Sequence, residues 1–156
     1  MIAAILALLF YQTPPAPLPG FGDFAVEETF RGTPKVPLIE SKGQRGYRTT
    51  IRNAAKEGPD FAGHYKVARA GCGSDCGVFF IVDVMTGRVY DLPFHVAAFP
   101  PIFVYQGGGA GVDFRINSRL MILRGCPEET ACATYAYEWT GSALKLLRKT
   151  PAVELR

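Results

Sequence analysis

The chain has 156 residues, of which 48% are apolar and 20% are charged, and this fits one globular domain with a hydrophobic core rather than two domains. The formal charge of +3 comes from 17 Lys and Arg against 14 Asp and Glu. These charges are spread along the chain, so the sequence predicts no nucleic-acid partner.

The first twenty residues predict an export signal and a proline-rich junction. Residues 1–11, MIAAILALLFY, are uninterrupted apolar chain, and ten such residues make a helix of about 15 Å, too short for a bilayer core of about 30 Å. No Lys or Arg precedes the run and no clear cleavage site follows it, so a short membrane anchor or a buried N-terminal element is the alternative. We expect residues 21–156 to form a single β-rich domain, periplasmic or secreted, with no stable membrane span after signal removal.

The next part of the chain predicts irregular structure followed by one helix. Residues 21–42 contain two separated prolines, which allow at most one edge strand. In residues 44–57 apolar side chains recur at helical spacing with charged residues on the other faces, and Gly58-Pro59 ends the pattern.

Short β-branched or aromatic runs, punctuated by Gly, Asn and Ser, follow Pro59 and predict strands. They lie at residues 64–70, 77–84, 88–92, 102–106, 112–116, 119–125, 133–139 and 143–148. Their connections are too short for crossover helices, so neighbouring strands should pair as antiparallel hairpins. The predicted fold class is therefore α+β, mainly an antiparallel β-sheet of about six to eight short strands with one N-terminal helix near residues 44–57.

A glycine-rich stretch, QGGGAG at residues 106–111, superficially resembles a phosphate-binding loop. No Lys-Ser or Lys-Thr pair follows it and no helix is predicted to begin there. We therefore expect a flexible linker or a bulge.

The four cysteines fall into two pairs, each at the mouth of a predicted hairpin loop. Paired positions on antiparallel strands have Cα atoms about 4.5 to 5.5 Å apart, which suits a disulfide. We predict the bonds Cys72–Cys76 and Cys126–Cys132, each contributing about 2 kcal/mol and consistent with an oxidising compartment. Crossed bonds, such as Cys72 with Cys132, and a four-thiolate zinc site are the alternatives, although five residues between ligands is wide for zinc. No metal and no cofactor are predicted.

The two histidines, His64 and His95, have no recognisable nucleophile elbow near them, so both are interpreted as structural residues. A small cell-envelope hydrolase that uses His64 with Asp60 or Asp75 is the enzymatic alternative.

Rigid, bridged loops on a sheet suit recognition, because preorganised loops lose less entropy on binding. The sequence therefore favours a non-enzymatic binding or inhibitor module over an enzyme, with an envelope protein or another envelope component as the unidentified partner. A purely structural envelope protein is a further alternative. The candidate binding residues are His64, Tyr65, Asp75, Arg88, Tyr90 and Glu128.

Three stretches together, GPDFAGHYKVARAGCGSDCG (58–77), IVDVMTGRVYDLP (81–93) and RGCPEETACATYAYEW (124–139), resemble a family of small exported proteins from Gram-negative bacteria. The resemblance covers residues 44–148 and rests on the FAGHY and GCG-x-x-C elements. It implies a periplasmic location and bridged cysteines, but no activity, substrate or catalytic residue.

A shorter motif, TGRVY at residues 86–90, is similar to the Ser-Gly-x-x-Tyr loop of periplasmic lysozyme inhibitors, with Thr86 in the place of Ser. That likeness implies a loop that inserts into an enzyme cleft. A Thr-Gly turn between two strands is also an ordinary hairpin connection.

Overall fold

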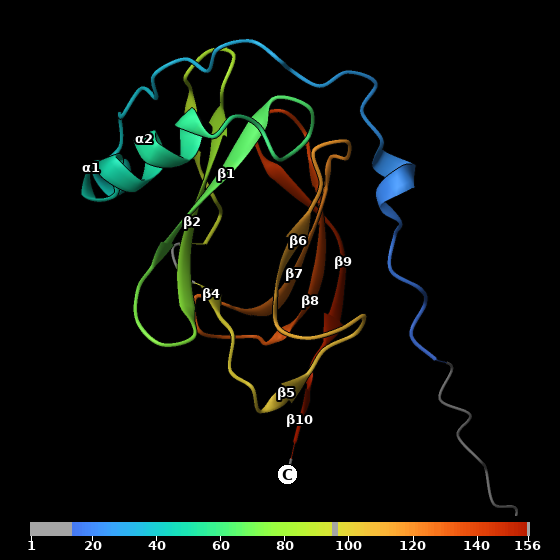
Figure 1. Cartoon of the computed structure of the whole chain (residues 1–156). Helices are drawn as coiled ribbons and strands as arrows, with labels where there is room; N and C mark the ends of the chain where they lie inside the picture. The colour runs from blue at the N-terminus through green and yellow to red at the C-terminus, as the bar shows by residue number, and fades with distance from the viewer. Residues whose placement is uncertain (1–13, 95–96, 156) are drawn as a thin grey trace, which may run out of the picture.

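The structure, a computed structural model, describes residues 14–94 and 97–155. The undescribed residues 1–13 include the apolar run 1–11 of the predicted export signal, and His95 also lies outside the described residues (Figure 1). Within the described ranges, none of the helices has both the length and the apolar character needed to cross a bilayer.

The described chain is mainly antiparallel β-sheet, which confirms the predicted fold class (Figure 1). Its strands are β1 (Tyr65–Gly71), β2 (Cys76–Asp83), β3 (Val89–Asp91), β4 (Ala97–Ala98), β5 (Phe103–Val104), β6 (Gly111–Phe114), β7 (Leu120–Pro127), β8 (Ala133–Trp139), β9 (Leu144–Pro151) and β10 (Val153–Glu154). The main sheet has eight strands, with the order β1-β2-β4-β7-β8-β9 and with β3 on β2 and β6 on β7. A separate two-stranded sheet pairs β10 with β5.

The predicted strands agree closely with the observed ones. Each of the eight predicted runs overlaps one strand, and the run 133–139 has the bounds of β8. The two strands that were not predicted, β4 and β10, have two residues each. Both form through long-range pairing, which local sequence patterns do not report.

The main sheet bends so that β1 and β2 face β6 to β9 across the core (Figure 1). The inner faces of both halves contribute to one hydrophobic cluster, which includes Tyr65, Val67, Phe79, Ile81, Met121, Leu123, Tyr135, Tyr137 and Trp139. Trp139 is 1% exposed and makes edge contacts with the rings of Tyr65 and Tyr90, at centroid distances of 5.2 and 5.1 Å. Aromatic packing between strands that are distant in sequence therefore fills the space inside the bend.

The outer face of β1 and β2 is covered by the short helix α2 (Arg48–Lys56), and the preceding helix α1 (Lys42–Gly46) lies against β3. The single helix predicted near residues 44–57 is thus wrong in detail, because the chain turns at Tyr47, where φ is −114° and ψ is 18°. α1 begins at a capping box, in which the Ser41 hydroxyl accepts from the Gln44 amide and the Gln44 side chain accepts from the Ser41 amide. From α2, Ile51 and Ala55 pack onto the sheet.

Lys66 joins the end of α2 to the start of β1. Its Nζ lies 2.8 Å from Glu57 Oε2 and 2.9 Å from Asp60 Oδ2, and Asp60 Oδ1 also accepts the Val67 amide. Burial alone would lower the pKa of Lys66, but hydrogen bonds and charges from Glu57 and Asp60 outweigh it and raise that pKa. Asp60 is therefore committed to a structural ion pair.

Residues 16–40, here called the N-terminal strap, run along the outside of the sheet. Near its start, Phe21 and Phe24 in the 3-10 helix Phe21–Phe24 pack against Leu120, Ile122 and Ala136, on the outer face of β7 and β8. Further along, four backbone amides of the strap donate to backbone carbonyls of the rest of the domain. The donors are Val26, Phe30, Lys35 and Leu38, and their acceptors are Asn117, Gly63, Val84 and Gly87 in the same order. The strap is irregular, as predicted, but it covers core strands.

Tyr137 provides a test of core packing at high pH. It is 7% exposed, and burial, followed by the charge of Tyr135, raises its pKa to about 12. In the unfolded chain the Tyr137 hydroxyl ionises near pH 10. Its contribution to the unfolding free energy is therefore complete below pH 10 and is lost between pH 10 and 12, at about 1.4 kcal/mol per pH unit. The unfolding free energy, measured by urea titration, should fall with pH over that range less steeply in Tyr137→Phe than in the parent. The two slopes should differ by about 1.4 kcal/mol per pH unit, the value for one proton. The same slope in parent and variant would show that burial does not raise the pKa of the Tyr137 hydroxyl.

Candidate functional site

The two disulfide loops flank the short strand β4. Both predicted bonds are present, Cys72–Cys76 and Cys126–Cys132. In the sheet register Cys76 lies opposite Ala98, and Ala98 in turn lies opposite Cys126. The two covalent loops therefore lie at the same edge of the molecule, where the two halves of the sheet meet.

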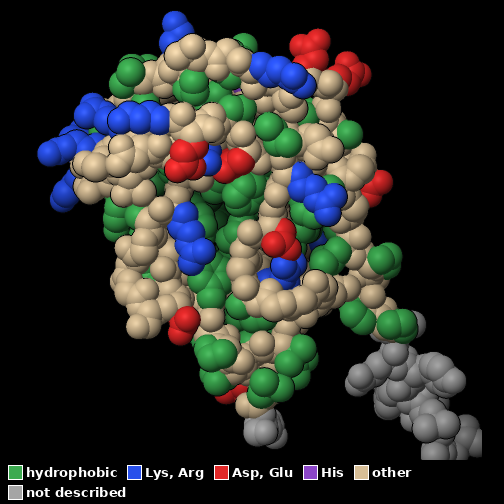
Figure 2. All heavy atoms as spheres, viewed as in Figure 1, with side chains coloured by type: hydrophobic (Ala, Val, Ile, Leu, Met, Phe, Trp, Pro, Cys, Tyr) green, Lys and Arg blue, Asp and Glu red, His purple; other side chains and the backbone are tan. Residues whose placement is uncertain are grey.

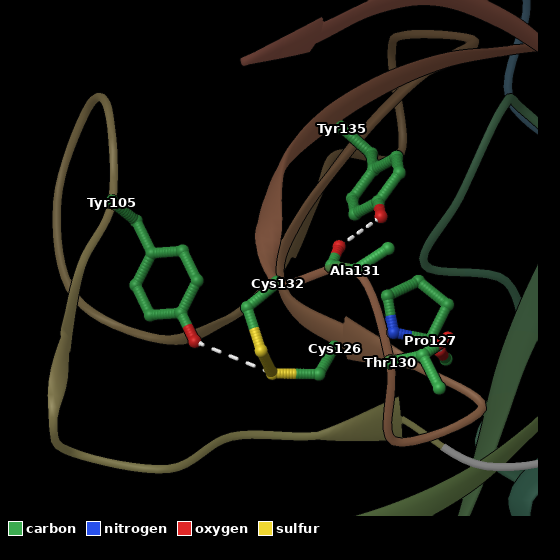
Figure 3. Close-up of a disulfide and its surroundings, with 7 residues drawn as sticks. All are labelled: Tyr105, Cys126, Pro127, Thr130, Ala131, Cys132 and Tyr135. Atoms are coloured by element: carbon green, nitrogen blue, oxygen red, sulfur yellow. Dashed lines mark hydrogen bonds between the residues drawn. A yellow bond between two sulfur atoms is a disulfide. The ribbon is translucent and has the colours of Figure 1, made fainter. Parts of the chain in front are cut away.

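The Cys126–Cys132 loop is held from both sides (Figure 3). Tyr105 is 5% exposed, and its hydroxyl oxygen lies 3.9 Å from Cys126 Sγ. The hydroxyl is the donor, because a disulfide sulfur carries no hydrogen. The Tyr135 hydroxyl donates to the Ala131 carbonyl, and Thr130 Oγ1 donates to the Pro127 carbonyl at 3.2 Å. Burial raises the pKa of Tyr105, which keeps its hydroxyl protonated as a donor.

The Cys72–Cys76 loop closes the β1–β2 hairpin and is more exposed. Its Cα atoms are 5.3 Å apart, and the Asp75 carbonyl accepts the Phe99 amide at 2.8 Å. On the inner face just below, the Arg69 guanidinium lies 5.6 Å from the ring centroids of both Phe79 and Phe99. Figure 2 shows apolar side chains visible between the two halves of the sheet on this side of the molecule.

The backbone of both loops is strained. Of the five described non-glycine residues with positive φ, four lie in these loops: Asp75 (52°), Glu128 (52°), Glu129 (59°) and Ala131 (46°). The left-handed conformation costs about 1 to 2 kcal/mol per residue, so the disulfides and the hydrogen bonds must hold it. Three of the four residues are acidic and exposed. We call the loops 72–76 and 126–132 the acidic loop pair.

The alternative cysteine arrangements do not occur. All four sulfurs are used in local bonds, so neither a crossed pairing nor a four-thiolate zinc site forms. Within the described ranges, no three His, Cys, Asp or Glu side chains are grouped so that they could hold a metal ion.

The FAGHY motif forms a buried turn between the strap and β1. Ala62 (φ 44°) and Gly63 (φ 86°) both have left-handed backbone. The Gly63 amide donates to the Ile116 carbonyl at 2.6 Å, and its carbonyl accepts the Phe30 amide at 2.8 Å. A Cβ on Gly63 would lie 2.6 Å from the Glu28 carbonyl oxygen. These contacts give the motif a structural explanation.

His64 follows this turn, and its ring contacts that of Tyr65 at a tilt of 33°, with centroids 4.2 Å apart. It lines a cavity of about 300 Å³ together with Glu28, Thr29, Phe30, Arg31 and Met85. Neither proposed acidic partner serves it. Asp60 is paired with Lys66, and Asp75 lies at the other end of the β1–β2 hairpin, about 20 Å away at roughly 3.3 Å per strand residue.

The six predicted binding residues fall into two groups. His64, Tyr65, Arg88 and Tyr90 lie at the end of the hairpin that carries the FAGHY turn, whereas Asp75 and Glu128 lie in the acidic loop pair. Tyr65 is buried, and its hydroxyl donates to the Gly141 carbonyl at 3.3 Å. Tyr90 is half-buried against the core, with the Arg88 guanidinium 5.3 Å from its ring centroid. In the first group, therefore, the two tyrosines serve packing.

The TGRVY turn lies under the strap. The Gly87 carbonyl accepts the Leu38 amide at 2.8 Å, and a Cβ on Gly87 would meet the Val36 carbonyl oxygen at 2.5 Å. Gly87 itself is buried. Met85, Thr86 and Arg88 in the same turn remain exposed, so the strap covers one side of the turn and not its tip.

The glycine-rich loop is held by Arg124 rather than left open for phosphate. Arg124 is 8% exposed, and its Nε donates to the Gly109 carbonyl at 2.6 Å. Its guanidinium also pairs with Asp113. The buried charge is thus neutralised, and it fixes the loop that precedes β6.

No protein-family model matches this chain, and no curated protein and no solved structure matches it either.

Neighbouring substitutions in the FAGHY turn should have different effects. Gly63→Ala places a methyl group against the Glu28 carbonyl in a left-handed position and should lower the unfolding free energy by at least about 2 kcal/mol. Ala62→Gly relieves similar backbone strain but removes a buried methyl worth about 0.8 kcal/mol, so it should stay within about 1 kcal/mol of the parent. Equal losses in chemical denaturation would show that the turn is not constrained in this way.

The two disulfides should be reduced in a fixed order. Cys72 is exposed, whereas Cys126 is 2% exposed beneath Tyr105. During brief treatment of the folded protein with dithiothreitol, iodoacetamide should label Cys72 and Cys76 before Cys126 and Cys132, as followed by peptide mass spectrometry. Simultaneous labelling would mean that the second loop opens as readily as the first.

Proposed function

We propose that this protein is an exported, non-enzymatic binding module and that the acidic loop pair is its contact surface. The observation that carries the proposal is the shared position of the two loops, locked by disulfides on either side of β4 with exposed acidic residues in strained backbone. Strain of this kind is concentrated at functional sites, and loops fixed in advance lose little entropy on binding.

The site geometry favours binding over hydrolysis. A hydrolase built on His64 would need an acidic or nucleophilic partner within hydrogen-bond reach. Of the two carboxylates considered for that role, Asp60 is paired with Lys66 and Asp75 lies at the far end of the hairpin. Glu28 lines the same cavity as His64, but the two side chains form neither a hydrogen bond nor an ion pair. A purely structural envelope protein would have no use for acidic side chains held in costly conformations at a single edge.

The proposed partner is an envelope protein with a basic surface, because Asp75, Glu128 and Glu129 would meet cations on it. The two disulfides indicate a non-cytoplasmic protein. The finer location, periplasmic or secreted, is part of the proposal and draws on the signal-like N-terminus and on the resemblance to small exported proteins of Gram-negative bacteria.

Site-specific photo-crosslinking tests this surface. A photo-reactive residue at Ser74, in a Gram-negative cell that exports the chain, should give a discrete crosslinked product with a second protein. Asp75→Lys with Glu129→Lys should reduce its yield about tenfold, because two attractive charges become repulsive.

The matched control is Glu27→Lys with Glu28→Lys, which makes the same change in net charge on exposed positions of the strap. It should leave the crosslinked yield within about twofold of the parent. The proposal fails if Ser74 gives no product, or if both double variants lower the yield equally while their melting temperatures match that of the parent.

A further inference from the structure

Positive charge gathers on the two helices. Between Lys42 and Lys56 the chain has five Lys and Arg residues and no Asp or Glu. All five are exposed, and Figure 2 shows Lys and Arg side chains grouped in this region of the molecule. Because Ile51 and Ala55 anchor α2 on the sheet, the cations occupy the helix surface turned away from the core.

A groove of about 350 Å³ lies between α2 and the strap. One wall is residues 33–37, held away from the helix because the Lys35 and Leu38 amides donate to the Val84 and Gly87 carbonyls, each at 2.8 Å. The other wall is the side of α2 that carries Thr49, Arg52 and Asn53. Both walls are therefore attached to the same side of the main sheet, and the groove is part of the fold.

Three cations from the two walls line this groove, and no carboxylate does. Lys35 comes from the strap, and Arg52 and Lys56 come from successive turns of α2. None of the three forms an ion pair with an acidic residue in the described ranges 14–94 and 97–155. Like charges brought together without a counterion repel one another, and a bound anion would relieve that repulsion.

The rest of the groove lining is partly apolar, so it could accommodate an apolar part of a ligand next to a charged one. Val36 is 72% exposed, and Pro34, Pro37 and Ala55 also line the groove. Thr49 and Asn53 add neutral hydrogen-bonding side chains beside the cations. The volume lies near the lower limit of small-molecule sites, which span about 300 to 1,000 Å³.

We propose that this groove binds a small amphiphilic anion, an alkyl phosphate. Its dianionic head would be held by Lys35, Arg52 and Lys56, and its alkyl chain would lie along Val36. Three cations lining one groove suit a phosphate monoester better than a singly charged head, and the apolar wall selects against bare inorganic phosphate. The groove lies at the opposite end of the β1–β2 hairpin from the acidic loop pair, so this proposal stands apart from the proposed function.

Isothermal titration calorimetry of the full chain with octyl phosphate, below its micelle concentration, tests the proposal. Binding should be measurable at low ionic strength and should weaken as salt is added. Inorganic phosphate and octyl glucoside, which supply the head and the chain alone, should each bind at least about tenfold more weakly.

Matched charge variants separate the groove from general electrostatic attraction. Arg52→Gln with Lys56→Gln should raise the Kd for octyl phosphate at least about tenfold. Lys42→Gln with Arg48→Gln removes the same amount of charge from α1 and α2, outside the groove lining, and should change the Kd less than about threefold. The exposed positions allow both variants to fold, which circular dichroism would verify.

Other results would overturn the proposal. These are no heat of binding at millimolar octyl phosphate, equal weakening by both double variants, or octyl glucoside binding as tightly as octyl phosphate. Sedimentation with phosphatidylglycerol vesicles distinguishes the source of the anion. If the parent binds vesicles but not monomeric octyl phosphate, the cationic face meets a lipid surface and the groove is not a small-molecule site.

Discussion

Two alanines hold the halves of this sheet together. Ala97 and Ala98 of β4 pair with β2 on one side and with β7 on the other. This requires very close backbone approach, because a Cβ on Gly125 would lie 2.7 Å from the Ala98 carbonyl oxygen. A side chain at Gly125 would separate these strands, and the disulfide loops are attached at this junction.

The bend at β4 also explains why both central strands are buried on both faces. Inward side chains of β2 and β7 meet in the shared core, and their outward side chains need separate cover. The helices cover β2, and Phe21 and Phe24 of the strap cover β7. The irregular N-terminal region therefore does the packing that a second layer of regular structure does in many α+β domains.

Local features were predictable from the sequence, and long-range ones were not. Hairpin strands and the two disulfides follow from alternation, turn residues and cysteine spacing, all within a few residues. β4 has only Ala97 and Ala98, with no β-branched or aromatic residue to mark a strand. For Tyr65 and Tyr90 an aromatic pattern fits a core face or an exposed face equally, so only the fold shows that they pack against Trp139. Two features of the helical region are visible in the sequence alone. The S-x-x-Q motif at Ser41 indicates the start of a helix, and the run from Lys42 to Lys56, which has no Asp or Glu, indicates a positively charged surface.

The strap also bears on the order in which the chain can fold. Its partners lie far along the chain from it. Arg148 donates to the Pro17 carbonyl across 131 residues, and Ser118 donates to the Phe21 carbonyl across 97. High contact order of this kind slows folding, because distant segments must meet before their contacts stabilise anything. The outer face of β7 and β8 can therefore be covered only once residues 118 to 148 are available to contact the strap, so a chain that lacks them leaves Phe21 and Phe24 without their packing partners.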